Sequence, residues 1–163
     1  KTLEDTRLRI LSGLICWYSG NFYRPRFKQL DYIQKLISEK NDLRGVSLGG
    51  IILKKSGELI SINREPSAIK ITKDINGKKI LWDNRWSINF GKAYNQNLKI
   101  VPLGSLNYKK KEIFYPKSTT KSTLNTLPAI LNENKLVFTP FSKLAYDIEV
   151  DLLCSDKHLF KNF

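Results

Sequence analysis

The chain has 163 residues and a formal net charge of +13 at pH 7, from 28 Lys and Arg against 15 Asp and Glu. Hydrophobic residues make up 41% of the chain and aromatic residues 11%, a composition that excludes an intrinsically disordered tail or a collagen-like repeat. A chain of this size buries roughly 70% of its unfolded surface, enough for one domain or one domain with a small appendage. We therefore expect a globular, basic protein.

Several kinds of site are excluded. Two cysteines and one histidine are too few for a disulfide framework or a four-ligand zinc site, and Cys154 and His158 lack a third member for a catalytic triad. Gly49 and Gly50 are not followed by the Lys-Ser/Thr pair of a phosphate-binding loop, and we expect them to mark a β-bulge or a close backbone approach. We predict no catalytic residue and no metal site.

The cysteine count and the hydropathy pattern also bear on the compartment. The two cysteines indicate a reducing environment, and we expect the protein in the cytoplasm. Every apolar run is far shorter than the about 18 residues of a membrane span, so no membrane partner is predicted. The chain contains no Met and starts without a signal-like segment, and we expect it to be a fragment of a longer protein.

Two helices are predicted at the start of the chain. Apolar residues recur at helical spacing over residues 2–18, with Glu4 and Asp5 in the first turn, where negative charge is favourable. The pattern stops at Ser19-Gly20-Asn21 and resumes over residues 27–37. Near residue 43 the composition shifts to β-branched residues and glycine. We therefore divide the chain into a helical segment, 1–43, and a β-rich domain, 44–163.

The rest of the chain is predicted to form β-hairpins. Turn signals, including Asn76-Gly77, separate short strands expected at 46–54, 58–63, 79–82, 85–90, 129–131 and 135–138. Residues 146–152 alternate between apolar and charged, which predicts a half-buried strand, and 94–97 and 107–121 are expected as surface loops. The predicted class is α+β: an N-terminal helical hairpin followed by a hairpin-built domain, barrel-like or sandwich-like.

Positive charge is concentrated in the middle of the chain. Residues 44–121 carry 16 basic and 5 acidic side chains, whereas residues 122–163 carry 4 and 5. Such asymmetry is typical of polyanion binding, because each phosphate neutralised by Lys or Arg releases condensed counterions. A solvated lysine-rich surface is the alternative, and for Lys109-Lys110-Lys111 both interpretations remain open.

Arginine is the more selective signal, because its planar guanidinium binds phosphate through two hydrogen bonds and stacks on bases. Arg85 lies between Trp82 and Trp86, where the structural alternative is that Asp83 fixes a turn, the tryptophans pack in the core and Arg85 pairs with an acid. Arg24 and Arg26 flank Pro25 and either contact nucleic acid or tie the helices to the β domain. The predicted nucleic-acid-binding residues are Arg24, Arg26, Arg64, Lys78, Lys79, Arg85, Lys109, Lys110 and Lys111.

Seven short motifs follow one another along nearly the whole chain. They are Tyr23-Arg24-Pro25-Arg26, Leu48-Gly49-Gly50, Asn63-Arg64-Glu65-Pro66, Leu81-Trp82-Asp83-Asn84-Arg85-Trp86, Pro102-Leu103-Gly104, Thr126-Leu127-Pro128-Ala129 and Phe138-Thr139-Pro140. In this order they resemble the C-terminal region of bacterial tRNA(Ile)-lysidine synthetase.

The resemblance implies the tRNA-binding part of an ATP-dependent ligase, with the helical segment 1–43 as a substrate-binding segment and 44–163 as the C-terminal domain. That enzyme adenylates the wobble cytidine in the CAU anticodon of tRNA(Ile) and then joins free lysine to it. Its N-terminal catalytic domain carries a Ser-Gly-Gly-x-Asp-Ser signature that this sequence lacks, so we expect that domain to be missing. No cofactor is expected in this chain; ATP with Mg and lysine would be substrates of the complete enzyme.

Two other functions fit the residues. The first is a stand-alone basic RNA-binding module with no enzymatic parent. The second is a protein-interaction domain whose positive charge is only compositional. Salt dependence distinguishes them, because phosphate contacts weaken steeply with added salt and apolar contacts do not.

Overall fold

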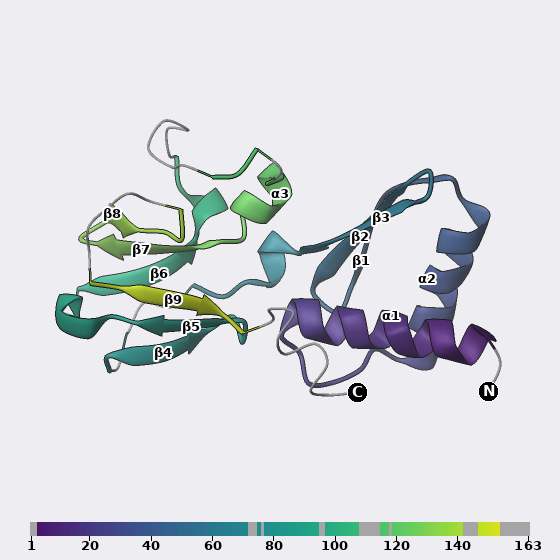
Figure 1. Ribbon diagram of the computed structural model, residues 1–163, viewed down its shortest axis with the longest axis horizontal. Coiled ribbons are helices and arrows are strands. Elements are labelled where there is room, and N and C mark those ends of the chain that lie inside the picture. Colours follow the sequence, from purple (N-terminus) through teal and green to yellow (C-terminus); the bar gives the residue numbers. More distant parts are fainter. Residues whose placement is uncertain are drawn as a thin grey trace. The chain divides into compact units, whose positions relative to one another are not determined.

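We describe a computed structural model (Figure 1). It describes residues 3–71, 75, 77–94, 97–107, 115–117, 119–141 and 147–153. The chain divides into two compact units between Glu65 and Pro66. The expected α+β class is confirmed: a pair of helices precedes three small antiparallel sheets, and none of the described sheets closes into a barrel.

Unit 1 packs two helices with one sheet. Its elements are α1 (Leu3–Ser19), α2 (Phe27–Glu39), β1 (Asp42–Leu48), β2 (Ile51–Ser56) and β3 (Leu59–Arg64), with the strands in the order β1-β2-β3. Ile15 of α1 and Ile33 of α2 share one buried core with Ile51 and Leu53 of β2. The boundary expected at residue 43 coincides with the change from helix to strand. It lies inside unit 1, because the helices and the sheet share one core.

The turn between β1 and β2 differs from the expectation. Gly49 and Gly50 have φ of +61° and +84°, and Leu48 pairs with Ile51, so the two glycines form a two-residue hairpin turn of the I′ kind. The single strand expected at 46–54 is therefore wrong, because the chain reverses in its middle. The bulge expected at these glycines lies elsewhere, because the register of β1 shifts between Leu43 and Val46. The alternative expectation, a close approach, is confirmed at Gly49, where a Cβ would lie 3.1 Å from Ile15 Cγ2.

Unit 2 contains two more three-stranded sheets. One consists of β4 (Lys79–Trp82), β5 (Trp86–Asn89) and β9 (Glu149–Leu152), and the other of β6 (Leu98–Pro102), β7 (Pro128–Asn132) and β8 (Lys135–Phe138). Short helical turns at Pro66–Ala68, Gly91–Ala93 and Leu103–Ser105 and the one-turn helix α3 (Lys121–Leu124) lie between strands. Both sheets contribute to one core that includes Trp82, Ile88, Ile100 and Ile130.

The strand predictions in unit 2 are confirmed at β4, β7 and β8 and, within a residue or so, at β5. Strand β6 was not predicted, although Leu98 and Ile100 are almost completely buried. The last predicted strand is confirmed from Glu149 to Leu152, whereas Tyr146, Asn76 and most of the loop expected at 107–121 lie outside the described residues.

A buried ion pair fixes the turn between β4 and β5. Asp83 and Asn84 have φ of +50° and +53°, and the Arg85 amide donates to the Trp82 carbonyl at 3.1 Å. The Arg85 Nε donates to Asp83 Oδ2 at 2.7 Å, and both side chains are only 5% exposed. Arg85 Nη2 also donates to the Thr126 carbonyl at 3.4 Å, so this side chain links the hairpin to the segment before β7.

We predict that Arg85→Leu lowers the free energy of unfolding by about 3–5 kcal/mol, because it leaves the Asp83 carboxylate buried without its guanidinium partner. Urea unfolding measures the change. The double variant Asp83→Asn/Arg85→Leu should be clearly less destabilised, because no unpaired charge remains. Equal destabilisation of the single and double variants would show that the ion pair does not govern this turn.

Candidate nucleic-acid interface

The predicted binding residues fall into three groups. Arg24 and Arg26 are exposed in the loop between α1 and α2, and Lys78 and Lys79 are exposed at the start of β4. Two others, Arg64 and Arg85, are buried, at 6% and 5% exposure. The lysines Lys109, Lys110 and Lys111 lie outside the described residues.

Arg64 acts within the scaffold of unit 1. Its Nη1 donates to the Gly50 carbonyl at 2.5 Å, and the Glu65 amide donates to the same oxygen at 2.9 Å. Because Arg64 pairs with Ile51 across β3 and β2, its guanidinium is directed back onto the β1–β2 turn. Arg85 also binds protein atoms, the Asp83 carboxylate and the Thr126 carbonyl, as the structural alternative for its motif states. Both guanidinium groups are therefore directed into the protein.

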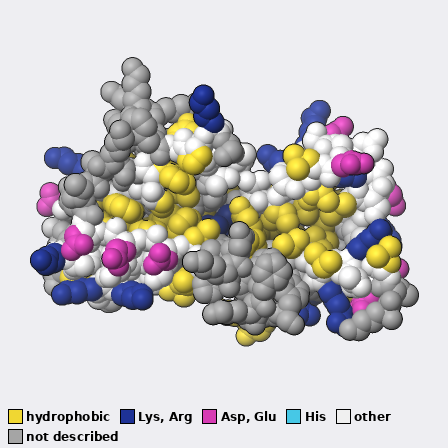
Figure 2. Space-filling view, viewed as in Figure 1, with side chains coloured by type: hydrophobic (Ala, Val, Ile, Leu, Met, Phe, Trp, Pro, Cys, Tyr) yellow, Lys and Arg dark blue, Asp and Glu magenta, His cyan; other side chains and the backbone are white. Residues whose placement is uncertain are grey.

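Lys79 lies in a mixed electrostatic environment. It pairs across the sheet with Asn89, which pairs in turn with Glu149, so the three side chains share one face of the β4-β5-β9 sheet. The Asn89 side-chain amide donates to Glu149 Oε2 at 3.1 Å, and Asp151 lies on the same face, two residues along β9. In Figure 2 acidic side chains lie over β9, with basic ones below them towards β4. A phosphate bound here would lie near carboxylates as well as lysines.

The loop between α1 and α2 has a different charge pattern. Residues 6–30 contain five basic side chains and no Asp or Glu. Arg24 and Arg26 make no ion pair with a described carboxylate, and Asp31, the first acid after the loop, is paired with Lys35 at 2.9 Å. We call residues 20–28 the basic loop. Among the described residues, it is the predicted site where exposed arginines lie in a stretch of sequence without acids.

Aromatic side chains accompany these arginines. Phe22 and Tyr23 are 90% and 91% exposed, and Phe27 and Tyr32 are 68% and 59% exposed. Phe27 belongs to the apolar pattern that predicts α2, whereas Phe22 is missed by reasoning from the sequence. The concentration of aromatic and basic residues from Phe22 to Lys28, in a stretch without acids, was the signal that could have identified them.

Four hydrogen bonds hold the backbone of the basic loop in place. The Asn21 side-chain amide donates to the Gly49 carbonyl at 2.9 Å, and the Asn21 backbone N–H donates to Ser19 Oγ at 3.2 Å. The Cys16 thiol donates to the Tyr23 carbonyl at 3.5 Å, and the Arg26 amide donates to Gln29 Oε1 at 3.3 Å. The loop is therefore attached to α1, to α2 and to the β1–β2 turn, and its exposed side chains project from a fixed frame.

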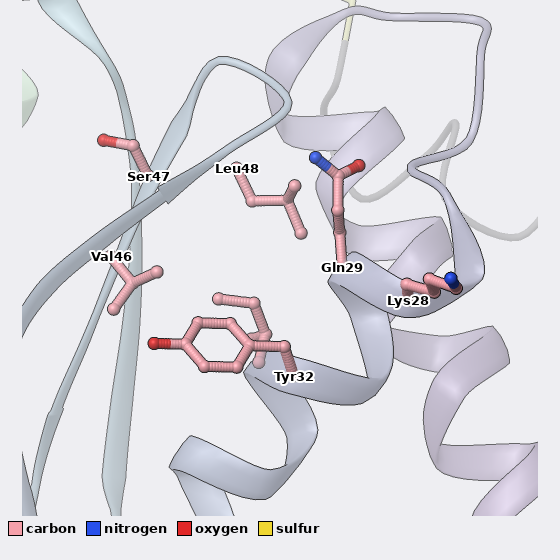
Figure 3. A pocket seen from close by; sticks show the side chains of 7 residues that line it. Lys28, Gln29, Tyr32, Val46, Ser47 and Leu48 are labelled. Carbon is pink, nitrogen blue, oxygen red and sulfur yellow. The ribbon is translucent and has the colours of Figure 1, made fainter.

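A shallow cleft lies beside the start of α2 (Figure 3). It has a volume of about 340 Å³ and is lined by Lys28, Gln29, Tyr32 and Ile33 of α2 and by Val46, Ser47 and Leu48 of β1. Figure 3 shows the Tyr32 ring extending from α2 towards β1, while the Ser47 hydroxyl points away from α2. That hydroxyl donates to Glu65 Oε1 at 3.0 Å. The cleft is thus largely apolar, with Lys28 and Gln29 at its edge.

The described residues provide no sign of a membrane span or a metal centre. None of their helices is long and apolar enough to cross a membrane. No group of three or more His, Cys, Asp or Glu side chains in this part of the chain could hold a metal ion.

The Cys16 thiol is sensitive to the position of Arg24. Burial raises the pKa of this thiol, and the positive charge of Arg24 lowers it by a smaller amount.

We predict that alkylation of Cys16 has a midpoint at higher pH than alkylation of a free cysteine peptide, and that Arg24→Ala raises this midpoint further. Peptide mass spectrometry after iodoacetamide labelling measures it for Cys16 alone. An unchanged or lower midpoint in Arg24→Ala would place the guanidinium away from the thiol.

Comparison with known proteins finds relatives in one family. The chain is 29% identical over 150 residues to the tRNA(Ile)-lysidine synthase of Wolbachia sp. subsp. Brugia malayi (strain TRS), with 84% of the chain and 32% of the relative covered. It is 28% identical over 139 residues to that of Wolbachia pipientis wMel, with the same coverage. It is 26% identical over 148 residues to that of Rickettsia akari (strain Hartford), with 86% and 34% covered.

No family model and no solved structure matches the chain. The chain spans about a third of the length of the relatives above, as a C-terminal region would. The resemblance seen in the seven motifs is confirmed by these relatives. By sequence, the chain is similar to part of the tRNA(Ile)-lysidine synthases.

Proposed function

We propose that this chain is the tRNA-binding part of a tRNA(Ile)-lysidine synthase and acts on tRNA(Ile) with the CAU anticodon. The catalytic domain, which uses ATP with Mg and lysine, would correspond to the part of the relatives that this chain does not cover. The observation that carries the proposal is the basic loop, where Arg24, Arg26 and Lys28 are exposed in a segment without a carboxylate. The relatives, all tRNA(Ile)-lysidine synthases, support the choice of tRNA.

The chemistry of the basic loop suits RNA. Base edges of an A-form stem lie in a deep, narrow groove, so a protein grips such RNA mainly through phosphates and 2′-hydroxyls. Exposed arginines provide these contacts, and the fixed backbone of the loop limits the ordering cost of binding to their side chains. A second grip on the tRNA, away from the anticodon, raises the effective concentration of the anticodon at a linked active site.

Among the residues predicted from sequence, we propose direct contacts for Arg24, Arg26, Lys78 and Lys79. The lysines at 109–111 stay a prediction for the same role. Arg64 and Arg85 are assigned to the scaffold instead, because their guanidinium groups bind backbone carbonyls and are almost completely buried. The cytoplasm, where tRNA is modified, is the compartment that this function requires.

A salt titration of tRNA binding tests the proposal. We predict that the 163-residue chain binds a tRNA(Ile) transcript with an affinity that falls linearly on a log–log plot between about 50 and 200 mM salt. Arg24→Ala/Arg26→Ala should weaken binding and reduce the slope by roughly 0.7–0.9 for each phosphate that is no longer neutralised. Filter binding provides both quantities.

The matched control is Arg7→Ala/Arg9→Ala, which removes two exposed arginines of α1 and produces the same change in net charge. Its slope should stay close to that of the unmodified chain. If the two double variants weakened binding equally, the basic loop would contribute only through the overall charge of the chain and not through specific contacts. Absence of salt-dependent tRNA binding by the unmodified chain would contradict the phosphate contacts and leave the protein-interaction function as the alternative.

A further inference from the structure

The two most exposed aromatic side chains of the described residues are neighbours in the basic loop. Phe22 and Tyr23 expose 90% and 91% of their surface, although their backbone is held by the Asn21–Gly49 and Cys16–Tyr23 hydrogen bonds. Single exposed apolar residues are common on protein surfaces. An adjacent pair on a fixed backbone, followed directly by Arg24 and Arg26, indicates a surface for a partner.

The surroundings of the pair select the kind of partner. Arg24, Arg26 and Lys28 lie in a stretch of sequence without Asp or Glu, so the surface attracts an anion. An aromatic ring next to arginines matches a nucleotide, since the ring stacks on the base and the guanidinium binds the phosphate. The fixed backbone reduces the entropy that binding must overcome.

Stacking also selects the form of the RNA. Inside a duplex the faces of the bases are covered by neighbouring base pairs, and only unpaired or terminal bases offer a free face to a side chain. Contacts to phosphates alone would not require Phe22 or Tyr23 to be exposed. The pair therefore points to nucleotides that are not part of a continuous helix.

We propose that Phe22 and Tyr23 stack on unpaired nucleotides of the bound RNA, while Arg24 and Arg26 contact the adjoining phosphates. This inference rests on the proposed function, because it takes RNA as the ligand of the basic loop. It adds the class of RNA element that the aromatic pair contacts: a single-stranded segment or a single-stranded end of the tRNA, next to the phosphates that the arginines bind.

Two RNA probes and three double variants of the 163-residue chain test the inference. The probes are a fluorescein-labelled single strand of about 10 nucleotides, within the site sizes of single-strand-binding domains, and a blunt duplex containing the same strand. The variants are Phe22→Leu/Tyr23→Leu, which keeps apolar area but removes the rings, Phe22→Tyr/Tyr23→Phe, which keeps the rings, and Leu59→Ala/Ile60→Ala. This last pair is a control that removes exposed apolar residues of β3. Fluorescence anisotropy gives each affinity.

The leucine variant should bind the single strand about tenfold more weakly or worse, with the salt slope unchanged, because stacking does not release counterions. Its affinity for the duplex should fall much less, because only the two terminal base pairs of that probe offer a free face. The ring-keeping variant and the β3 control should bind both probes normally. Circular dichroism of each variant checks that the fold is retained.

Other outcomes overturn the inference in distinguishable ways. Full single-strand binding by the leucine variant, in a chain whose binding still depends on Arg24 and Arg26, would refute stacking and leave the proposed function intact. An equal weakening on the duplex would refute the preference for unpaired nucleotides. Absence of salt-dependent RNA binding by the unmodified chain would refute the proposed function itself.

Discussion

The carbonyl groups of the Gly49-Gly50 turn organise the candidate interface. Gly49 accepts a hydrogen bond from the side chain of Asn21 in the basic loop, and Gly50 accepts one from Arg64 at the end of β3. Both glycines have positive φ, and a Cβ at Gly49 would lie 3.1 Å from Ile15 Cγ2 of α1. The turn therefore connects helix, sheet and loop at one point, and the loop depends on it for its fixed backbone.

Arginine has two distinct roles in this chain. Where the guanidinium meets backbone carbonyls or a buried carboxylate, as in Arg64 and Arg85, it shapes the turns that define each unit. Where it lies in a segment without acids, as in Arg24 and Arg26, it remains available to an external anion. Net charge alone does not separate these roles. The +13 of the sequence contains scaffold cations, cations near carboxylates on the β4-β5-β9 sheet, and the exposed arginines of the basic loop.

Much of the architecture follows from local patterns in the sequence. Helical periodicity located α1 and α2, and turn residues located the hairpins of unit 2, because these signals act over a few residues. The β1–β2 turn was not predicted, because apolar residues on both sides of Gly49-Gly50 made residues 46–54 resemble one continuous strand. The burial of Arg64 and the exposure of Phe22 depend on tertiary packing, which residue type does not reveal. The arginines on either side of Pro25 pointed to the basic loop, and the lack of acids from residue 6 to residue 30 is a further signal in the sequence that could have supported it.

The contact between RNA and the basic loop is measured most directly by ultraviolet cross-linking of the chain to a tRNA(Ile) transcript, followed by mass spectrometry of the peptides. The expected result is a nucleotide adduct on the peptide containing Phe22 and Tyr23, carried by an unpaired nucleotide of the tRNA. Adducts found only on other peptides, with this one unmodified at saturating tRNA, would contradict an RNA contact at the loop between α1 and α2.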